Sequence, residues 1–286
     1  MTRAFRPFNL LIIALICLTF EVLSHRLHGS NIAFSLEFIA FTIGAMMVTA
    51  AGYLINGYFD QKIDRINKPG YHFPFNKTKT YGISLVLVAF GLTIGVIFYS
   101  IEFTLGFILM PAIVLWLYSA SLKRLPLIGN ISVAFLSFWL PTGLLLTNES
   151  LDLLKSDTFS SQITMLLLVE MFVISLAREI IKDIQDIEGD RIENCNTFPI
   201  LINEKIAGIT ASALLTIGAL MWFNVLKKNL ESLSILNIAF GALTLLFVLG
   251  SIVLLWNKKA WKERTKLSSM TIKLSMLFAL LTAIFI

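Results

Sequence analysis

Long apolar segments follow one another through almost the whole chain, and they constrain its fold more than any other feature. A helix needs about 20 mainly apolar residues to cross the hydrocarbon core of a bilayer. Nine segments meet or nearly meet this length, at 8–25, 34–56, 79–100, 103–121, 127–147, 160–178, 206–226, 233–256 and 270–286. Only 14% of the residues are charged, against about 25% in soluble domains. The sequence therefore predicts an all-α polytopic membrane protein, a nine-transmembrane-helix bundle with a central cavity, forming a single domain over 1–286.

The basic residues predict how this bundle is oriented. Of the 23 Lys and Arg residues, 18 fall on the side of the N-terminus. The other side holds Arg26, Lys155, Lys227 and Lys228, and Lys273 lies inside the last segment. Cytoplasmic loops are enriched in basic residues, so we expect a cytoplasmic N-terminus. Topology also accounts for the net charge of +5 without a nucleic-acid partner, and nothing indicates an obligate protein partner. The first segment has no small-residue cleavage site, and we expect it to be retained.

Two acidic clusters stand at the ends of the second and sixth apolar segments, both on the predicted cytoplasmic side. The first consists of Asn56, Asp60 and Asp64, and the second of Glu179, Asp183, Asp186 and Asp190. Their spacings predict that each cluster occupies one face of a helix. Acids in such a stripe repel one another. The stripes therefore indicate bound cations, the alternative being two solvated helix ends.

The chemistry that suits these clusters is the binding of a diphosphate through metal ions. Mg²⁺ is usually held by one or two carboxylates together with phosphate oxygens and water. Such ions neutralise charge as an allylic C–O bond breaks, and apolar helices would hold the isoprenoid and exclude water. The predicted metal ligands are Asp60, Asp64, Asp186 and Asp190, supported by Asn56 and Asp183. Nearby basic residues that could contact phosphate are Lys123, Arg178 and Lys182.

These motifs resemble the UbiA superfamily of intramembrane prenyltransferases over nearly the whole chain. The family's first motif, N-D-x-x-D-x-x-x-D, is matched by Asn56, Asp60 and Asp64, and the match continues through residues 64–69. Its second motif, D-x-x-x-D, falls on Asp186 and Asp190. The stretch 178–190 looks most like the geranylgeranylglyceryl-phosphate geranylgeranyltransferase branch.

The resemblance implies a reaction and further site residues. It implies Mg²⁺-dependent transfer of a prenyl group from a polyprenyl diphosphate to a lipid-soluble or aromatic acceptor within membrane lipids, with release of pyrophosphate. Residues 118–123, followed by Gly129 and Asn130, are similar to the family's loop after the fourth helix. Residues 6–9 are similar to the start of its first helix. These matches imply that Tyr118 and Asn9 bind substrate.

The chain departs from the family pattern at two positions, and two other functions compete with prenyl transfer. Gly57 stands where the first motif usually has an aspartate, and Tyr71 replaces an expected arginine. The altered loop keeps open a membrane terpene cyclase, which would ionise the diphosphate without an acceptor. A transporter is an alternative of a different class, because acids within membranes often mark ion paths. Transporter sites usually lie near the bilayer midplane, whereas both clusters here lie at helix ends.

Overall fold

The structure is a computed structural model that describes residues 2–67, 70, 72–257 and 261–285. Every regular element in these ranges is helical. The long helices are α1 (Pro7–Leu27), α2 (Leu36–Phe59), α4 (Lys77–Phe98), α7 (Ile128–Thr147), α8 (Phe159–Ile192), α10 (Glu204–Lys228), α11 (Ile235–Leu255) and α12 (Trp261–Ile284). A further long helix joins α5 (Ile101–Thr104), a π-helical turn (Leu105–Leu109) and α6 (Met110–Ala120). The short elements are η1 (Thr2–Phe5), α3 (Gln61–Asn67), η3 (Leu122–Arg124), η4 (Asp152–Lys155), α9 (Phe198–Leu201) and η5 (Leu230–Ser232).

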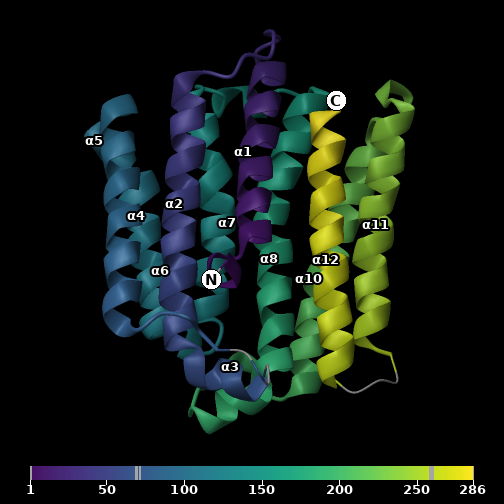
Figure 1. Ribbon diagram of the computed structural model, residues 1–286. Helices are drawn as coiled ribbons and strands as arrows, with labels where there is room; N and C mark the ends of the chain where they lie inside the picture. Colours follow the sequence, from purple (N-terminus) through teal and green to yellow (C-terminus); the bar gives the residue numbers. More distant parts are fainter. Residues whose placement is uncertain (1, 68–69, 71, 258–260, 286) are drawn as a thin grey trace.

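The long helices run side by side, and their connections gather at the two ends of the bundle (Figure 1). Within the described ranges, eight of them are long and apolar enough to cross a membrane. The predicted all-helical, multi-pass membrane class is thus confirmed. α8, with 34 residues, is not among the eight, although it runs through the same bundle (Figure 1). The count of nine spans therefore stays a prediction, as does the central cavity.

Helix starts follow from capping residues at the edges of the apolar segments. In each case a Ser, Thr or Asn side chain accepts a hydrogen bond from the backbone N–H three residues later. These N-caps are Ser35, Asn76, Ser100, Thr158, Asn203 and Ser234. Such caps satisfy donors that the first helical turn leaves unpaired. They fix where each helix begins more sharply than hydropathy does.

Two helices extend beyond the apolar segments from which they were predicted. α12 begins at Trp261 rather than at 270, and α8 continues to Ile192 rather than ending at 178. Hydropathy detects only the lipid-facing length, whereas polar residues continue a helix where water is available. The extension of α8 therefore carries the whole second acidic cluster on one continuous helix.

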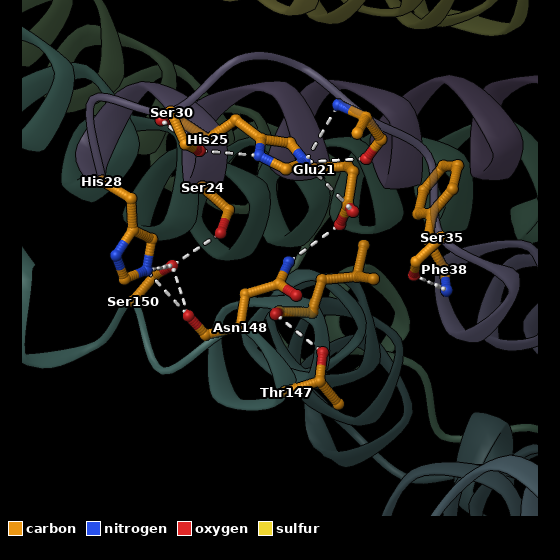
Figure 2. A network of polar contacts seen from close by, with 12 residues as sticks. Glu21, Ser24, His25, His28, Ser30, Ser35, Phe38, Thr147, Asn148 and Ser150 are labelled. Atoms are coloured by element: carbon orange, nitrogen blue, oxygen red, sulfur yellow. Dashed lines mark hydrogen bonds and ion pairs between the residues drawn. The ribbon is translucent and has the colours of Figure 1, made fainter.

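A polar network closes the end of the bundle opposite to the acidic clusters (Figure 2). Asn148, at the end of α7, donates from Nδ2 to Oε2 of the buried Glu21 in α1 at 2.8 Å. Ser24 and Ser150 share a hydrogen bond of 2.6 Å between their hydroxyl oxygens. A pocket of about 510 Å³ adjoins this network and is lined in part by Glu21 and Tyr99. The network ties α1 to α7, and none of the predicted site residues takes part in it.

Candidate active site at the acidic end of the bundle

The first acidic motif lies on two helices rather than one. α2 ends at Phe59, and Asp60 is its C-cap, with its N–H donating to the Asn56 carbonyl at 2.9 Å. α3 then carries Asp64 across the lower end of the bundle (Figure 1). The prediction that Asn56, Asp60 and Asp64 share one continuous helical face is therefore wrong. The break divides one carboxamide and two carboxylates between two helices, and it brings α3 into contact with α8.

α3 packs directly on the C-terminal part of α8, which brings the two acidic motifs together. Asn67 donates from Nδ2 to the backbone carbonyl of Asp186 at 3.2 Å. A β-carbon at Gly189 would lie 2.6 Å from that same Nδ2, so only glycine permits this approach. Asp64 and Asp190 are both buried, each 8% exposed.

Lys123 lies between the motifs and pairs with the first of them. Its ammonium group forms an ion pair with Oδ1 of Asp60, and its side chain is only 10% exposed. Asn56 donates from Nδ2 to the other carboxylate oxygen of Asp60 at 2.7 Å. The position of Lys123 depends on Gly129, because a β-carbon there would lie 2.7 Å from the Lys123 Cα.

The carboxylates of the second motif repel one another and those of the first. Burial, followed by the charges of Asp186 and Asp60, raises the pKa of Asp190 to about 7. Asp60 and Asp190 thus lie close enough to interact, although they come from different motifs. Burial also raises the pKa of Asp183 well above its usual range, opposed by a 2.8 Å hydrogen bond from Asn130 Nδ2. Electrostatic strain of this kind is relieved when a cation binds.

The remaining predicted residues surround this centre in different ways. Tyr118 lies within electrostatic range of Asp60 and Asp183. Arg178 and Lys182 both pair with Glu179, at 2.8 and 2.7 Å. The side chain of Asn9 instead hydrogen-bonds to Tyr53 of α2. Tyr71 lies outside the described residues, as do Lys68 and Pro69 of the first motif's continuation.

The donor set fits Mg²⁺, although the protein does not supply a complete coordination shell. Among the described residues, no three Asp, Glu, His or Cys side chains converge closely enough to hold a metal ion alone. The amide oxygens of Asn56 and Asn67 are buried at the two ends of the first motif and have no hydrogen-bond partner. Mg²⁺ usually binds a small number of protein oxygen ligands and completes its coordination with phosphate oxygens and water.

Two site residues had no role assigned from sequence. Asn130 holds Asp183, and Asn67 joins the two motifs. Both residues lie in stretches that resemble the family, and this resemblance is the sequence signal that could have indicated a role for them. Their partners are 53 and 119 residues away in the chain, so spacing alone could not reveal their contacts.

Fold and site together define a helical multi-pass membrane protein with paired acidic motifs and a lysine at one end of its bundle. Comparison with known families makes this specific, since residues 10–280 match the UbiA prenyltransferase family. The chain belongs to this family and is a prenyltransferase.

Relatives and solved structures agree with this assignment. The digeranylgeranylglyceryl phosphate synthase of Methanosarcina mazei is 34% identical over 248 residues, covering 83% of this chain and 78% of the relative. That of Methanosphaera stadtmanae is 31% identical over 277 residues, covering 96% and 94%. A UbiA homolog from Archaeoglobus fulgidus, solved with DMAPP and Mg²⁺, has a TM-score of 0.60 at 15% identity, covering 94% of this chain and 97% of that one. The structural likeness supports the fold.

Proposed function

We propose that this protein transfers a prenyl group from a polyprenyl diphosphate to a hydroxyl group of a glycerol phosphate lipid, with Mg²⁺ as cofactor. The observation that carries the proposal is the convergence of the two acidic motifs, with Lys123 between them. The relatives named digeranylgeranylglyceryl phosphate synthase support a geranylgeranyl donor and an acceptor that already carries one such chain.

Several residues of the site take part in binding the donor, each in a different role. Mg²⁺ would be held by Asp60, Asp64, Asp186 and Asp190, and when bound it would neutralise charge on the departing diphosphate. Asn56 orients the Asp60 carboxylate through its hydrogen bond. Lys123, already positioned beside Asp60, contacts the diphosphate directly. Asn130 holds Asp183 in place through a hydrogen bond of 2.8 Å.

The reaction exchanges one C–O bond for another. The acceptor oxygen forms an ether bond to C1 of the prenyl group, while the bond from C1 to the diphosphate breaks. The diphosphate leaves with the electron pair, and the hydroxyl proton passes to it. Exclusion of water by the apolar helices prevents capture of the allylic cation.

The proposal includes the orientation of the protein in the membrane. α8 is the ninth span, the N-terminus is cytoplasmic, and the acidic end faces the cytoplasm. The whole chain, 1–286, acts as one domain. The basic residues concentrated at the acidic end support this orientation.

The proposal is tested by removing carboxylate charge from each motif separately. Asp60→Asn and Asp190→Asn should each lower prenyl transfer by about a hundredfold or more, since oriented charge at a reacting centre contributes on this scale. Asp152→Asn is the matched control, because that side chain is 90% exposed at the opposite end. Product is measured by mass spectrometry, with thermal unfolding as the test of folding.

Three outcomes would contradict the proposal. Wild-type turnover in either motif variant would remove the acidic motifs from the mechanism. A cyclised hydrocarbon formed from the diphosphate alone would favour the terpene cyclase, and substrate-dependent ion flux in liposomes would favour the transporter.

A further inference from the structure

Four basic side chains from three parts of the chain gather around the carboxylate of Glu179. Arg178 and Lys182 of α8 bind it directly, from Nη1 to Oε1 at 2.8 Å and from Nζ to Oε2 at 2.7 Å. Arg6, which precedes α1, and Lys273 of α12 lie within electrostatic range of it. Lys273 is also within range of the other three cations. These four basic residues are called the cationic cluster below.

The cationic cluster carries four positive charges, of which two pair with Glu179, while Asp183 and Asp190 lie within electrostatic range of Lys182. Glu179 is only 5% exposed, so water screens these charges weakly. Uncompensated charge is costly where the dielectric constant is low. Arg178 has a buried Nε with no hydrogen-bond partner. Lys273 makes no hydrogen bond or ion pair with any residue that the structure describes. Unused donors and excess charge together indicate an anionic ligand.

The cationic cluster lies deeper in the bundle than the predicted metal ligands. Glu179 and Asp190 are on the same helix, separated by about 16 Å along its axis at 1.5 Å per residue. Lys123 pairs with Asp60 near the Asp190 end. α1 begins about midway along the bundle (Figure 1), and the guanidinium group of Arg6, which precedes it, lies 5.1 Å from the ring centroid of Tyr53 in α2. An anion held beside Arg178 and Lys273 therefore lies apart from a diphosphate at Asp60 and Asp190, whereas Lys182, one helical turn before Asp186, lies between the two sites.

We propose that the cationic cluster binds the phosphate monoester of the acceptor lipid, while the donor diphosphate binds at the acidic motifs. This rests on the proposed function, because it presupposes an acceptor that carries a phosphate. Four cations and one carboxylate leave an excess of three positive charges, most of which a phosphate monoester would balance, because its charge near neutral pH is about −1.5 to −2. The guanidinium groups add donors in the geometry that phosphate prefers. The cluster thereby selects phosphorylated acceptors over neutral lipid alcohols.

Lys273 provides the cleanest test, because it lies on a different helix from every acidic residue of the two motifs. The full-length protein is assayed with geranylgeranyl diphosphate and either geranylgeranylglyceryl phosphate or its dephosphorylated alcohol. Lys273→Met should raise KM for the phosphorylated acceptor about ten- to hundredfold, the usual range for a charge-assisted contact. KM for the diphosphate and transfer to the alcohol should change less than about twofold, given the separation along α8. Lys273→Arg should restore binding of the phosphorylated acceptor.

The controls separate this inference from the proposed function. Lys266→Met changes an exposed lysine on the same helix and should behave as wild type. If wild-type protein transfers no prenyl group to either acceptor, the proposed function fails. If wild-type protein is active and Lys273→Met keeps its KM for the phosphorylated acceptor, the cluster assignment fails alone. Equal loss with both acceptors, or a parallel rise in KM for the diphosphate, would likewise overturn it. Should Lys273→Met not fold, the KM values of Lys273→Gln decide in the same way.

Discussion

Gly57 occupies a position where the family's first motif usually has an aspartate, and an aromatic ring takes up the space of that side chain. A β-carbon at Gly57 would lie 2.6 Å from Cε2 and 2.9 Å from Cδ2 of Phe73. Phe73 in turn packs edge-on against Phe75 at 5.8 Å between ring centroids. The missing aspartate is therefore matched by an aromatic residue in the following loop. Asp60 and its contacts with Asn56 and Lys123 are retained beside it.

This pairing predicts a coupled effect on stability. Gly57→Ala should lower the free energy of unfolding by about 1–2 kcal/mol, because an overpacked side chain forces its neighbour to move. In a Phe73→Ala background the same substitution should be neutral or stabilising, since alanine favours a helix over glycine by about 1 kcal/mol. Thermal unfolding of the four proteins in detergent measures the coupling. Gly82→Ala is the control, as its β-carbon would meet nothing within 4 Å. Additive effects would show that Phe73 does not occupy this space.

At the scale of elements, the turn at η3 determines where Lys123 lies. Gly129, near the start of α7, allows the backbone of Lys123 and Leu122 to approach within 2.7–3.0 Å of the place where a β-carbon would be. The amide N–H of Asn196 also donates to the carbonyl of Arg124 at 2.9 Å, which joins this turn to the segment after α8. The turn thus joins Lys123 to the segment that follows the second motif, while Lys123 itself pairs with Asp60 and lies within electrostatic range of Asp190.

We expect Gly129→Ala to act on the site through this turn. The new methyl group would contact backbone atoms, which cannot move aside as a flexible side chain can, so the turn and Lys123 must shift. KM for the prenyl diphosphate should rise about tenfold, as expected when a charge-assisted contact of about 1.5 kcal/mol is lost. Lys123→Met should give a similar rise. Gly250→Ala, where a β-carbon has open space, should leave the kinetics unchanged. An unaltered KM in Gly129→Ala would show that Lys123 keeps its position without the glycine.

The elements also show what sequence alone could predict. Apolar length located the bundle helices, and the acidic spacing of α8 was confirmed because one helix carries it without interruption. The same spacing failed across Asp60, since helical periodicity cannot reveal where a chain turns. The contact between Asn67 and Gly189 depends on how two helices dock. Lys273 was interpreted only as a charge within a span, because its neighbours come from α8 and the start of α1.

At the scale of the whole molecule, the orientation of the bundle in the membrane depends on α8. If α8 crosses the bilayer, its two ends lie on opposite sides of the membrane. It is the longest of the described helices, and its first half packs in the apolar core through Ile163 and Leu167. Its second half carries the acidic motif that meets α3. We therefore expect α8 to cross the bilayer together with its neighbours α7 and α10.

Cysteine accessibility on either side of α8 tests this directly. Cys17 and Cys195 are buried and free, so replacing both by serine gives a background without reactive thiols. In that background Asp157→Cys, before α8, should react with a membrane-impermeant maleimide on intact cells. Arg191→Cys, at the end of α8, should react only after permeabilisation, because basic residues concentrate on the cytoplasmic side. Asn31→Cys and His72→Cys are matched controls, since both positions are exposed and lie in the loops before α2 and between α3 and α4. Labelling of Asp157→Cys and Arg191→Cys from the same side would mean that α8 does not span the membrane. The two acidic motifs and Lys123 could then not lie together on one side of the bilayer. Labelling of Arg191→Cys alone from outside would reverse the orientation and place prenyl transfer on the outer leaflet.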